Sequence, residues 1–227
     1  MSDLPLQPTA RTTLGRGRHH AVDDRHALHA LLDDALVAHV GVVVGDHPVV
    51  LPAAFGVDPS GPDDGGSLYL HGSVAARWLT VAVGATVCVT ITELDGLVAA
   101  RSGFNHSMNY RSAVVIGQGR AVTDADERAP ALDLIVDQMI AGRSGTLRPQ
   151  TRKELAATLV LAVPLREASL KVGAGDPEDE PEDVAAGVWA GVVPVARVLG
   201  EPVTSADAAG LPVPAHVRAR ASATSGQ

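Results

Sequence analysis

The chain has 227 residues, of which 46% are hydrophobic and 3% aromatic, so its core consists mostly of Val, Ala and Leu, and Val favours strands. A formal net charge of −8 argues against binding to nucleic acid or to anionic lipid. Cys88 is the only cysteine, which excludes an internal disulfide, and no apolar run approaches the ~20 residues of a membrane helix. The first twenty residues lack the apolar core of a signal peptide, so we expect a cytoplasmic protein.

The hydrophobic pattern predicts short strands interrupted by a few helices. In chain order, the expected elements are a helix over 23–36, strands over 38–44, 49–57 and 67–70, a helix over 74–83, strands over 86–94, 97–100 and 111–122, helices over 123–139 and 151–158, and an extended segment over 159–172. Asp95 and Gly96 predict a hairpin-type turn. Caps are expected at Asp23 or Asp24 and at Thr123 or Asp124.

Strands dominate this order, and no regular alternation of strand and helix appears. The sequence therefore predicts a mainly β fold with peripheral helices, an antiparallel barrel of six or seven strands. Residues 23–199 form the expected domain, residues 1–22 a flexible arm, and residues 200–227 a disordered tail rich in Ala, Pro, Ser and Thr. The acidic run within 173–183 is expected to be a solvated loop rather than a metal site.

One junction, at residues 68–78, has the residue types of an anion site. An expected strand ends at His71, Gly72 permits a turn, and Ser73 is placed to cap the next helix, which leaves backbone N–H groups free for an anion. Arg77 follows four residues later, and its guanidinium can donate two hydrogen bonds to a phosphate. Spacing alone favours the plainer alternative, in which Ser73 only caps a helix and Arg77 is a surface charge.

A second polar stretch opens the strand expected at 111–122. Four side chains offer hydrogen-bonding groups beside a Val-rich wall, namely Asn109, Tyr110, Arg111 and Ser112. Such a strand mouth could hold a flat ligand with polar edges, although an ordinary hairpin loop explains the same residues. Neither a Rossmann glycine motif after a strand, nor a Walker phosphate loop, nor a His-Glu-x-x-His metal motif occurs.

Taken in order, these segments resemble the flavin-nucleotide-binding and nitroimidazole-resistance branch of the pyridoxamine 5'-phosphate oxidase-like superfamily. The segments are 49–57, 68–73 with Arg77, 106–114 and 188–194. The resemblance implies an FMN-binding split β-barrel that forms a homodimer with FMN at the subunit interface. FAD, a deazaflavin and haem are alternative cofactors.

The resemblance also implies roles for particular residues. Ser73 and Arg77 would hold the phosphate, and the strand with Val50, Leu51, Pro52 and Ala53 would lie along the flavin ring. The residues expected to line the ribityl chain or the ring are His71, Asn109, Tyr110, Arg111 and Ser112. Trp189 would close the pocket from the partner chain. The family's Thr-Gly-Lys turn is replaced by Ser169 to Gly173, so no role is assigned to Lys171.

The implied activity is that of a flavin-dependent oxidoreductase that acts on a small molecule and accepts electrons from NADH or NADPH. A non-catalytic flavin-binding or sensor protein is the alternative. His71 could donate a proton, orient the flavin or make a purely structural hydrogen bond.

Overall fold

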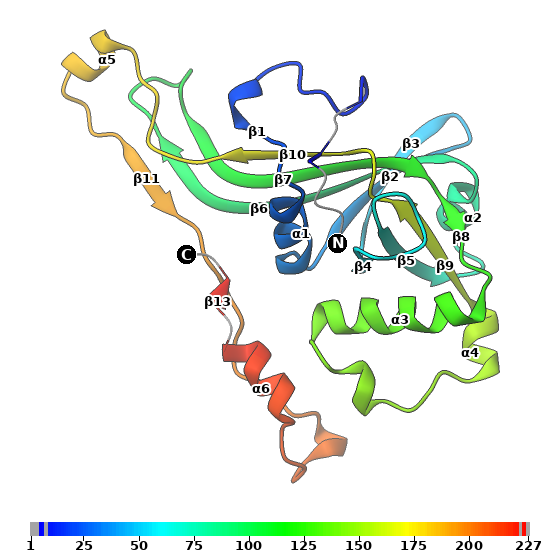
Figure 1. The fold of residues 1–227 in the computed structure, drawn as a ribbon. Helices are drawn as coiled ribbons and strands as arrows, with labels where there is room; N and C mark the ends of the chain where they lie inside the picture. The colour runs from blue at the N-terminus through cyan, green and yellow to red at the C-terminus, as the bar shows by residue number, and fades with distance from the viewer. Residues whose placement is uncertain (1–4, 7–8, 223, 226–227) are drawn as a thin grey trace.

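A computed structural model describes residues 5–6, 9–222 and 224–225, and two antiparallel sheets form its body (Figure 1). The larger sheet has the order β1-β10-β7-β6-β2-β3, and β11 adds to β6. Its strands are β1 (Ala21–Val22), β2 (Ala38–Val44), β3 (His47–Ala53), β6 (Thr86–Ala99), β7 (Ser107–Gln118), β10 (Ala168–Gly173) and β11 (Gly191–Pro194). The smaller sheet has the order β4-β5-β9-β8, from β4 (Phe55–Asp58), β5 (Ser67–Ser73), β8 (Arg120–Ala121) and β9 (Thr158–Pro164). The predicted mainly β, antiparallel class is confirmed.

Two apolar clusters hold these layers together. The larger lies among both sheets, α1 (Arg25–Asp34) and α2 (Arg77–Ala82), with fully buried Leu28, Phe55, Ile91 and Leu161 among its members. Burying one such side chain contributes about 1.5–3 kcal/mol. The smaller cluster lies between the second sheet and α3 (Ala125–Met139), and includes Tyr69.

The predicted helices form where the sequence offers caps. Asp24 accepts from the backbone of α1 (Arg25–Asp34), and Asp124 caps α3 (Ala125–Met139) in the same way. Thr151 and Glu154 make a reciprocal capping box at α4 (Arg152–Ala157). The other helices are α2 (Arg77–Ala82), α5 (Pro181–Ala185) and α6 (Ala215–Ser222), with short 3-10 turns η1 (Arg18–His20), η2 (Ser144–Thr146) and η3 (Ala206–Ala208).

The turn predicted at Asp95 and Gly96 is wrong. β6 continues through both residues to Ala99, and its pairing with β7 shifts register between Leu94 and Gly96, as at a β-bulge. The chain turns instead between Ala99 and Ser107. Because β11 pairs with β6 at Gly96–Ala99, a distant segment stabilises strand structure where local residues favour a turn.

Both ends of the chain carry more structure than expected. In the described part of the arm, β1 pairs with β10, while residues 1–4 and 7–8 of the predicted flexible arm lie outside the described residues. The segment expected to be disordered contains α6, whose Arg220 Nε donates to the Met139 carbonyl at 3.0 Å, and the two-residue strand β13 (Thr224–Ser225) pairs with β12 (Arg197–Val198). Among the described residues, no helix is both long and apolar enough to span a membrane.

Candidate functional site

The junction between β5 and α2 differs from its prediction at Ser73. Ser73 is the last residue of β5 and pairs with Thr158, and α2 begins three residues later than a Ser73 cap would require. Ala76 occupies the cap position and makes no side-chain bond, while Ser73 Oγ accepts from the Ala75 backbone N–H at 3.2 Å. The prediction that Ser73 caps this helix is therefore wrong, because pairing with β9 keeps the serine in the sheet.

Arg77 is the first residue of α2, and its side chain is exposed. Its guanidinium extends toward the turn between β2 and β3, since a Cβ placed on Gly45 would lie 4.0 Å from Arg77 Nη2. Among the described residues, this guanidinium has neither an ion pair nor a hydrogen bond. A free, two-pronged cation is thus available beside β3 for an anionic ligand.

The predicted ring-binding strand lies at a sheet edge. β3 pairs with β2 alone, so one side of its backbone has no neighbouring strand within the described chain. Val50 is 65% exposed and Pro52 is exposed, whereas Leu51 and Ala53 are half-buried. This edge therefore offers a flat apolar surface and free backbone groups close to Arg77.

His71 opens into a largely apolar cavity on the other side of the smaller sheet. Strand residues alternate, so Tyr69 and His71 share the face covered by α3. The cavity measures about 450 Å³, within the range typical of ligand sites. Its lining residues are Ala54, His71, Leu132, Ile135, Val136, Met139, Ile140, Arg143, Gln150, Glu154, Leu155 and Thr158. Burial lowers the pKa of His71, so its imidazole is neutral near pH 7.

Of the two charged side chains in this cavity, Glu154 is held by other residues, whereas Arg143 is nearly unrestrained. Glu154 is held by Arg148, at 2.6 Å, and by Thr151, and these bonds lower its pKa to about 2. A carboxylate so restrained stays ionised and is a poor proton donor at neutral pH. Among the residues that the structure describes, the Arg143 guanidinium makes a single long bond of 3.4 Å, to Thr146 Oγ1, so its charge can turn toward a ligand in the cavity.

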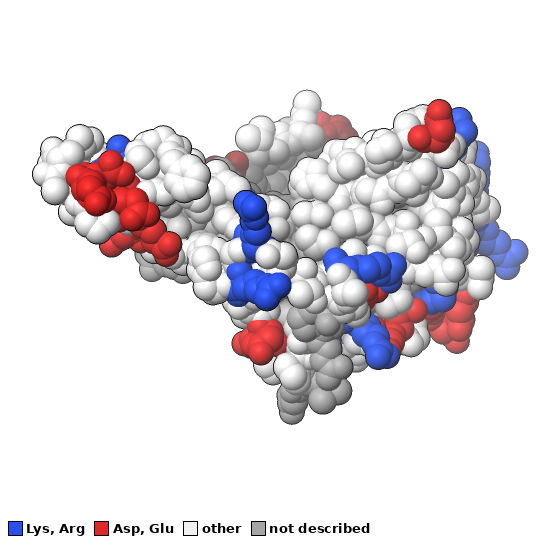
Figure 2. All heavy atoms as spheres, turned by 90° about the horizontal axis from the view of Figure 1, so that it is seen from above, with Lys and Arg blue, Asp and Glu red and all other residues white. Residues whose placement is uncertain are grey.

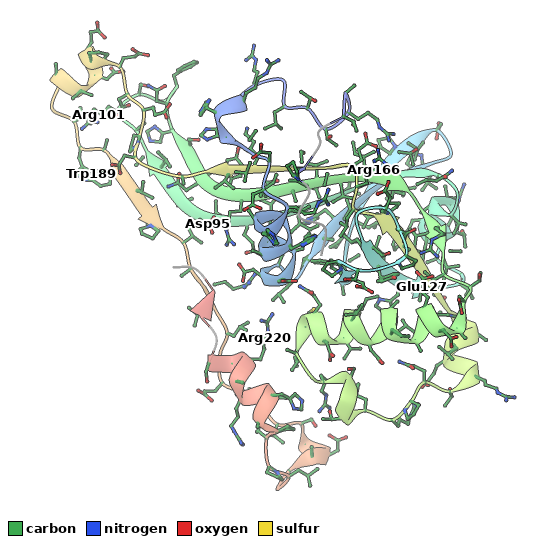
Figure 3. All side chains as sticks on the ribbon, in the orientation of Figure 1. Asp95, Arg101, Glu127, Arg166, Trp189 and Arg220 are labelled. Carbon is green, nitrogen blue, oxygen red and sulfur yellow. The ribbon has the colours of Figure 1, made fainter. Side chains whose placement is uncertain are left out.

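An ion-pair cluster holds α3, which forms one wall of the cavity, against the second sheet. Arg120 bonds Asp63 Oδ2 at 2.8 Å and Glu127 Oε1 at 2.6 Å. Glu127, which is labelled on α3 in Figure 3, also accepts from the Tyr69 hydroxyl at 3.0 Å. Burial raises the pKa of Tyr69 to about 12, so the hydroxyl remains a donor. The cluster fixes the wall while leaving the apolar stripe of α3 facing the cavity.

Sequence reasoning missed the role of this stripe. Leu132, Ile135, Val136 and Met139 recur at helical spacing, which predicts an ordinary core-facing helix. Ile135 is indeed buried, but Met139 is 42% exposed and lines the cavity mouth. The only available signal was the polar segment between this helix and the next, which forms the rest of the wall.

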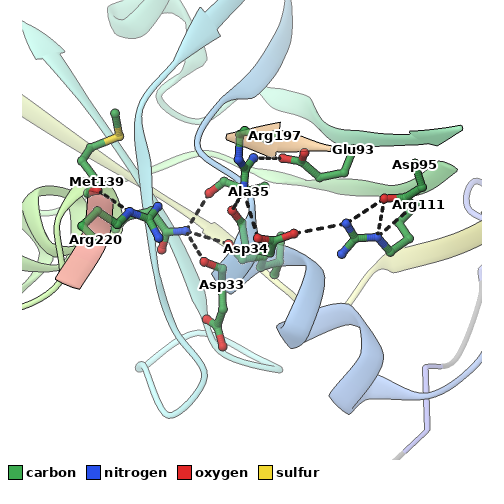
Figure 4. A network of polar contacts seen from close by, with 11 residues as sticks. Asp33, Asp34, Ala35, Glu93, Asp95, Arg111, Met139, Arg197 and Arg220 are labelled. Carbon is green, nitrogen blue, oxygen red and sulfur yellow. Dashed lines mark hydrogen bonds and ion pairs between the residues drawn. The ribbon is translucent and has the colours of Figure 1, made fainter. Parts of the chain in front are cut away.

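The predicted residues of β7 lie away from this cavity and from Arg77. Arg111 donates to Asp95 at 3.0 Å and to Asp34 at 3.1 Å, and Asp34 also pairs with Arg197, which reaches Glu93 (Figure 4). Arg111 therefore joins β7 to α1 and β6, and Arg197 joins the C-terminal segment to the same Asp34 and to β6.

The other predicted residues of this region also have local partners. Ser112 Oγ lies 3.1 Å from Thr92 Oγ1, and Asn109 Nδ2 donates to the Gly175 carbonyl at 3.0 Å. Tyr110 lines a separate cavity. Trp189 is 69% exposed on the segment between α5 and β11 (Figure 3). Within one chain, the predicted site residues thus fall into three places rather than one. The described residues contain no group of three or more His, Cys, Asp or Glu placed to hold a metal ion.

Comparisons with known proteins agree with this architecture. An FAD- and haem-binding protein from Mycobacterium smegmatis is 43% identical, with a TM-score of 0.81 over 88% of this chain and 97% of that one. The flavocytochrome Anf3 from Azotobacter vinelandii is 35% identical, with a TM-score of 0.85 over 95% and 98% of the two chains.

A more distant structure, described as a 5-nitroimidazole antibiotic resistance protein from Bacteroides thetaiotaomicron, is 22% identical over 67% of this chain and 86% of its own. Its TM-score of 0.54 supports the split-barrel fold alone. No curated protein matches the chain. The family model described as Pyridoxamine 5'-phosphate oxidase matches residues 24–172, more than half of the chain. The chain therefore belongs to the pyridoxamine 5'-phosphate oxidase family, and its fold is the predicted split barrel.

Proposed function

We propose that this protein is a cytoplasmic flavin-dependent oxidoreductase that binds a flavin nucleotide and a haem. Family membership supports a flavin, and the two most similar solved structures reported above are described as an FAD- and haem-binding protein and a flavocytochrome. These descriptions favour FAD over the FMN expected from sequence, and they favour haem as an additional group rather than a substitute.

The flavin would lie at the edge formed by β3 and α2. Arg77, with no competing partner among the described residues, would bind a phosphate, and Ser73 would donate its hydroxyl to the same group. The exposed face at Val50 and the backbone of Leu51 would contact the ring. The free edge and the free guanidinium lie together, which is the arrangement that a phosphate-bearing flat ligand needs.

The haem would occupy the apolar cavity below α3. His71 presents a neutral imidazole, whose free nitrogen can ligate iron, and Arg143 supplies a cation for a propionate. Most of the lining side chains are apolar, as a porphyrin requires. When bound, the flavin exchanges two electrons with a donor and the haem exchanges one at a time.

One observation carries this proposal: the segment from β5 to α2 contributes to both sites within a few residues. His71 lines the cavity, while the guanidinium of Arg77, six residues later, extends toward the turn between β2 and β3. Two redox groups held by one strand end would be neighbours, and residues of β5 would set their separation.

A homodimer completes the proposal. Apolar side chains remain exposed on one chain, at Val50 and along the C-terminal segment at Val193, Val198 and Val203. A second copy would cover them and would contribute Trp189 and the β7 residues Asn109, Tyr110 and Ser112 to the flavin. Light scattering on the purified protein should give twice the chain mass of 23.3 kDa, and a monomer would contradict this part.

The absorption spectrum of the purified protein tests the cofactor assignment. We expect flavin bands together with a Soret band, and His71→Ala should lose the Soret band while it retains the flavin. His19→Ala, which removes an exposed histidine of the arm, is the matched control and should change neither. Anaerobic titration with NADH or NADPH should bleach the flavin, and a flavin that stays oxidised with both donors would refute the oxidoreductase assignment.

A further inference from the structure

A second, polar cavity lies where the N-terminal arm meets the end of β10 and the loop between β6 and β7. It measures about 370 Å³ and lies apart from the β3 edge and the His71 cavity of the same chain. Its lining includes Asn109 and Tyr110, which a second copy would offer to the flavin. The polar side chains that line it include His20, His106, Asn109, Tyr110, Lys171, Asp176 and Glu178. Lys171 and the arm meet here because β1 pairs with β10, with Ala21 opposite Lys171.

Lys171 is the distinctive group of this cavity. It is one of the chain's two lysines, together with Lys153, and it is half-buried. A Cβ placed on Gly17 would lie 3.1 Å from Lys171 Nζ, and the same nitrogen lies 5.7 Å from the centre of the Tyr110 ring. Among the described residues, the ammonium has no carboxylate partner. A partly buried ammonium normally has one, so the cavity is suited to an anionic group from a ligand.

The neighbouring groups add donors, acceptors and an aromatic surface. His106 Nδ1 lies 2.8 Å from the Ser102 carbonyl, which can only accept, so Nδ1 carries the proton and Nε2 remains available. Asn109 uses its amide N–H for the Gly175 carbonyl, which leaves its own oxygen free to accept. Phe104 lines the cavity and is 96% exposed, as a stacking surface for a flat ring would be.

Negative charge around the cavity restricts the class of ligand. Asp176 and Glu178 belong to the acidic segment that leads into α5, and Figure 2 shows acidic side chains gathered at that end of the molecule. A bare anion would be repelled by these carboxylates. A ligand that combines one anionic group with hydroxyl donors would satisfy both Lys171 and the carboxylates, since carboxylates accept hydrogen bonds from ribose hydroxyls.

We propose that this cavity binds an adenine nucleotide. Lys171 pairs with the phosphate, Asp176 or Glu178 accepts from the ribose, and the base stacks on Phe104. The same chemistry is present in a free nucleotide, in the nucleotide half of NADH or NADPH, and in the adenylate half of FAD. The last case alone rests on the proposed function, because it requires that the protein's own flavin is FAD.

Calorimetric titration of the purified protein with AMP tests the site, with Lys171→Gln as the variant. A charged hydrogen bond to phosphate predicts at least about tenfold weaker binding in Lys171→Gln. Lys153→Gln removes the other lysine, exposed on α4, and should bind AMP like the natural protein. Lys171→Arg keeps the charge and should retain most of the affinity.

Two outcomes distinguish a diffusible nucleotide from the adenylate half of bound FAD. If AMP binds and NADH competes with it while the flavin content of Lys171→Gln is normal, the cavity serves a diffusible nucleotide. If AMP does not bind because the cavity is already filled, Lys171→Gln should release less FAD on denaturation than Lys153→Gln. Mass spectrometry of the released flavin measures this directly.

Phe104→Ala provides a second test that does not depend on the folding of Lys171→Gln. Its side chain is almost fully exposed, so truncating it should leave the fold intact. Loss of base stacking should weaken AMP or FAD retention about fivefold or more. The inference is overturned if both Lys171→Gln and Phe104→Ala match the natural protein in AMP affinity and in flavin content. A protein that purifies without flavin or haem but binds AMP through Lys171 would refute the proposed function and leave this site standing.

Discussion

Arg77→Ala should weaken flavin binding about 10- to 100-fold without destabilising the fold. The magnitude follows from charge-assisted hydrogen bonds, which contribute about 1.5–3 kcal/mol when one partner is ionised. Arg77 is exposed and has no partner among the described residues, so truncating it removes no native contact of the guanidinium. Surface substitutions of this kind change the free energy of unfolding by less than about 0.5 kcal/mol.

Flavin fluorescence on titration into flavin-free protein measures the dissociation constant, and a thermal melt checks the fold. Arg152→Ala is a matched control, because Arg152 also begins a six-residue helix and is also exposed. Arg77→Lys keeps the charge but loses the two-pronged geometry and should fall between the two. If Arg77→Ala binds flavin within twofold of Arg152→Ala, the phosphate does not lie at this guanidinium and the reasoning fails.

Three further predictions concern α3 and the apolar cavity that it covers. Gly56→Ala would place a Cβ 2.7 Å from the Ile135 backbone nitrogen, so it should push α3 outward and lower the unfolding free energy by about 1–3 kcal/mol in denaturant titrations; a normal midpoint would contradict this. The pKa of Glu154 falls from 4.5 to about 2 on folding, so its stabilising effect is complete above pH 4.5 and is lost toward pH 2. The melting temperature of Glu154→Gln should therefore converge with that of the natural protein as pH falls through this window, and parallel curves would refute it. Because the pKa of His71 is lowered, its NMR titration should fall below that of a free histidine, and haem retention should persist to that lower pH.

Much of the fold could be predicted from the sequence, because its helix starts are signalled locally. Asp24, Asp124 and Thr151 cap helices where expected, since a cap needs only a side chain and the next few backbone N–H groups. Ser73 looked equally suitable, but its backbone pairs with β9, a strand more than eighty residues away. Distant pairing also overrode the turn expected at Gly96.

The candidate site could be predicted only in part for the same reason. His71 and Arg77 were predicted from one local segment, and neither side chain has a hydrogen-bond or ion-pair partner among the described residues. Arg111 has the residue type of a ligand-binding group, yet its carboxylate partners come from α1 and from the bulge of β6. No sequence pattern links Asp34 to Arg111, so the ion pairs of that arginine could be found only in the folded structure.

Asp34 links the C-terminal segment to the rest of the protein through its ion pair with Arg197. A carboxylate in the last turn of a helix opposes the helix dipole, and Arg111 and Arg197 offset that cost. Arg197 lies beyond the residues 24–172 shared with the family, whereas Asp34 and Glu93 lie within them. Losing or exchanging the extension would leave Glu93 without the ion pair to Arg197 and Asp34 with Arg111 alone, so we expect the extension and these two acids to have changed together during evolution.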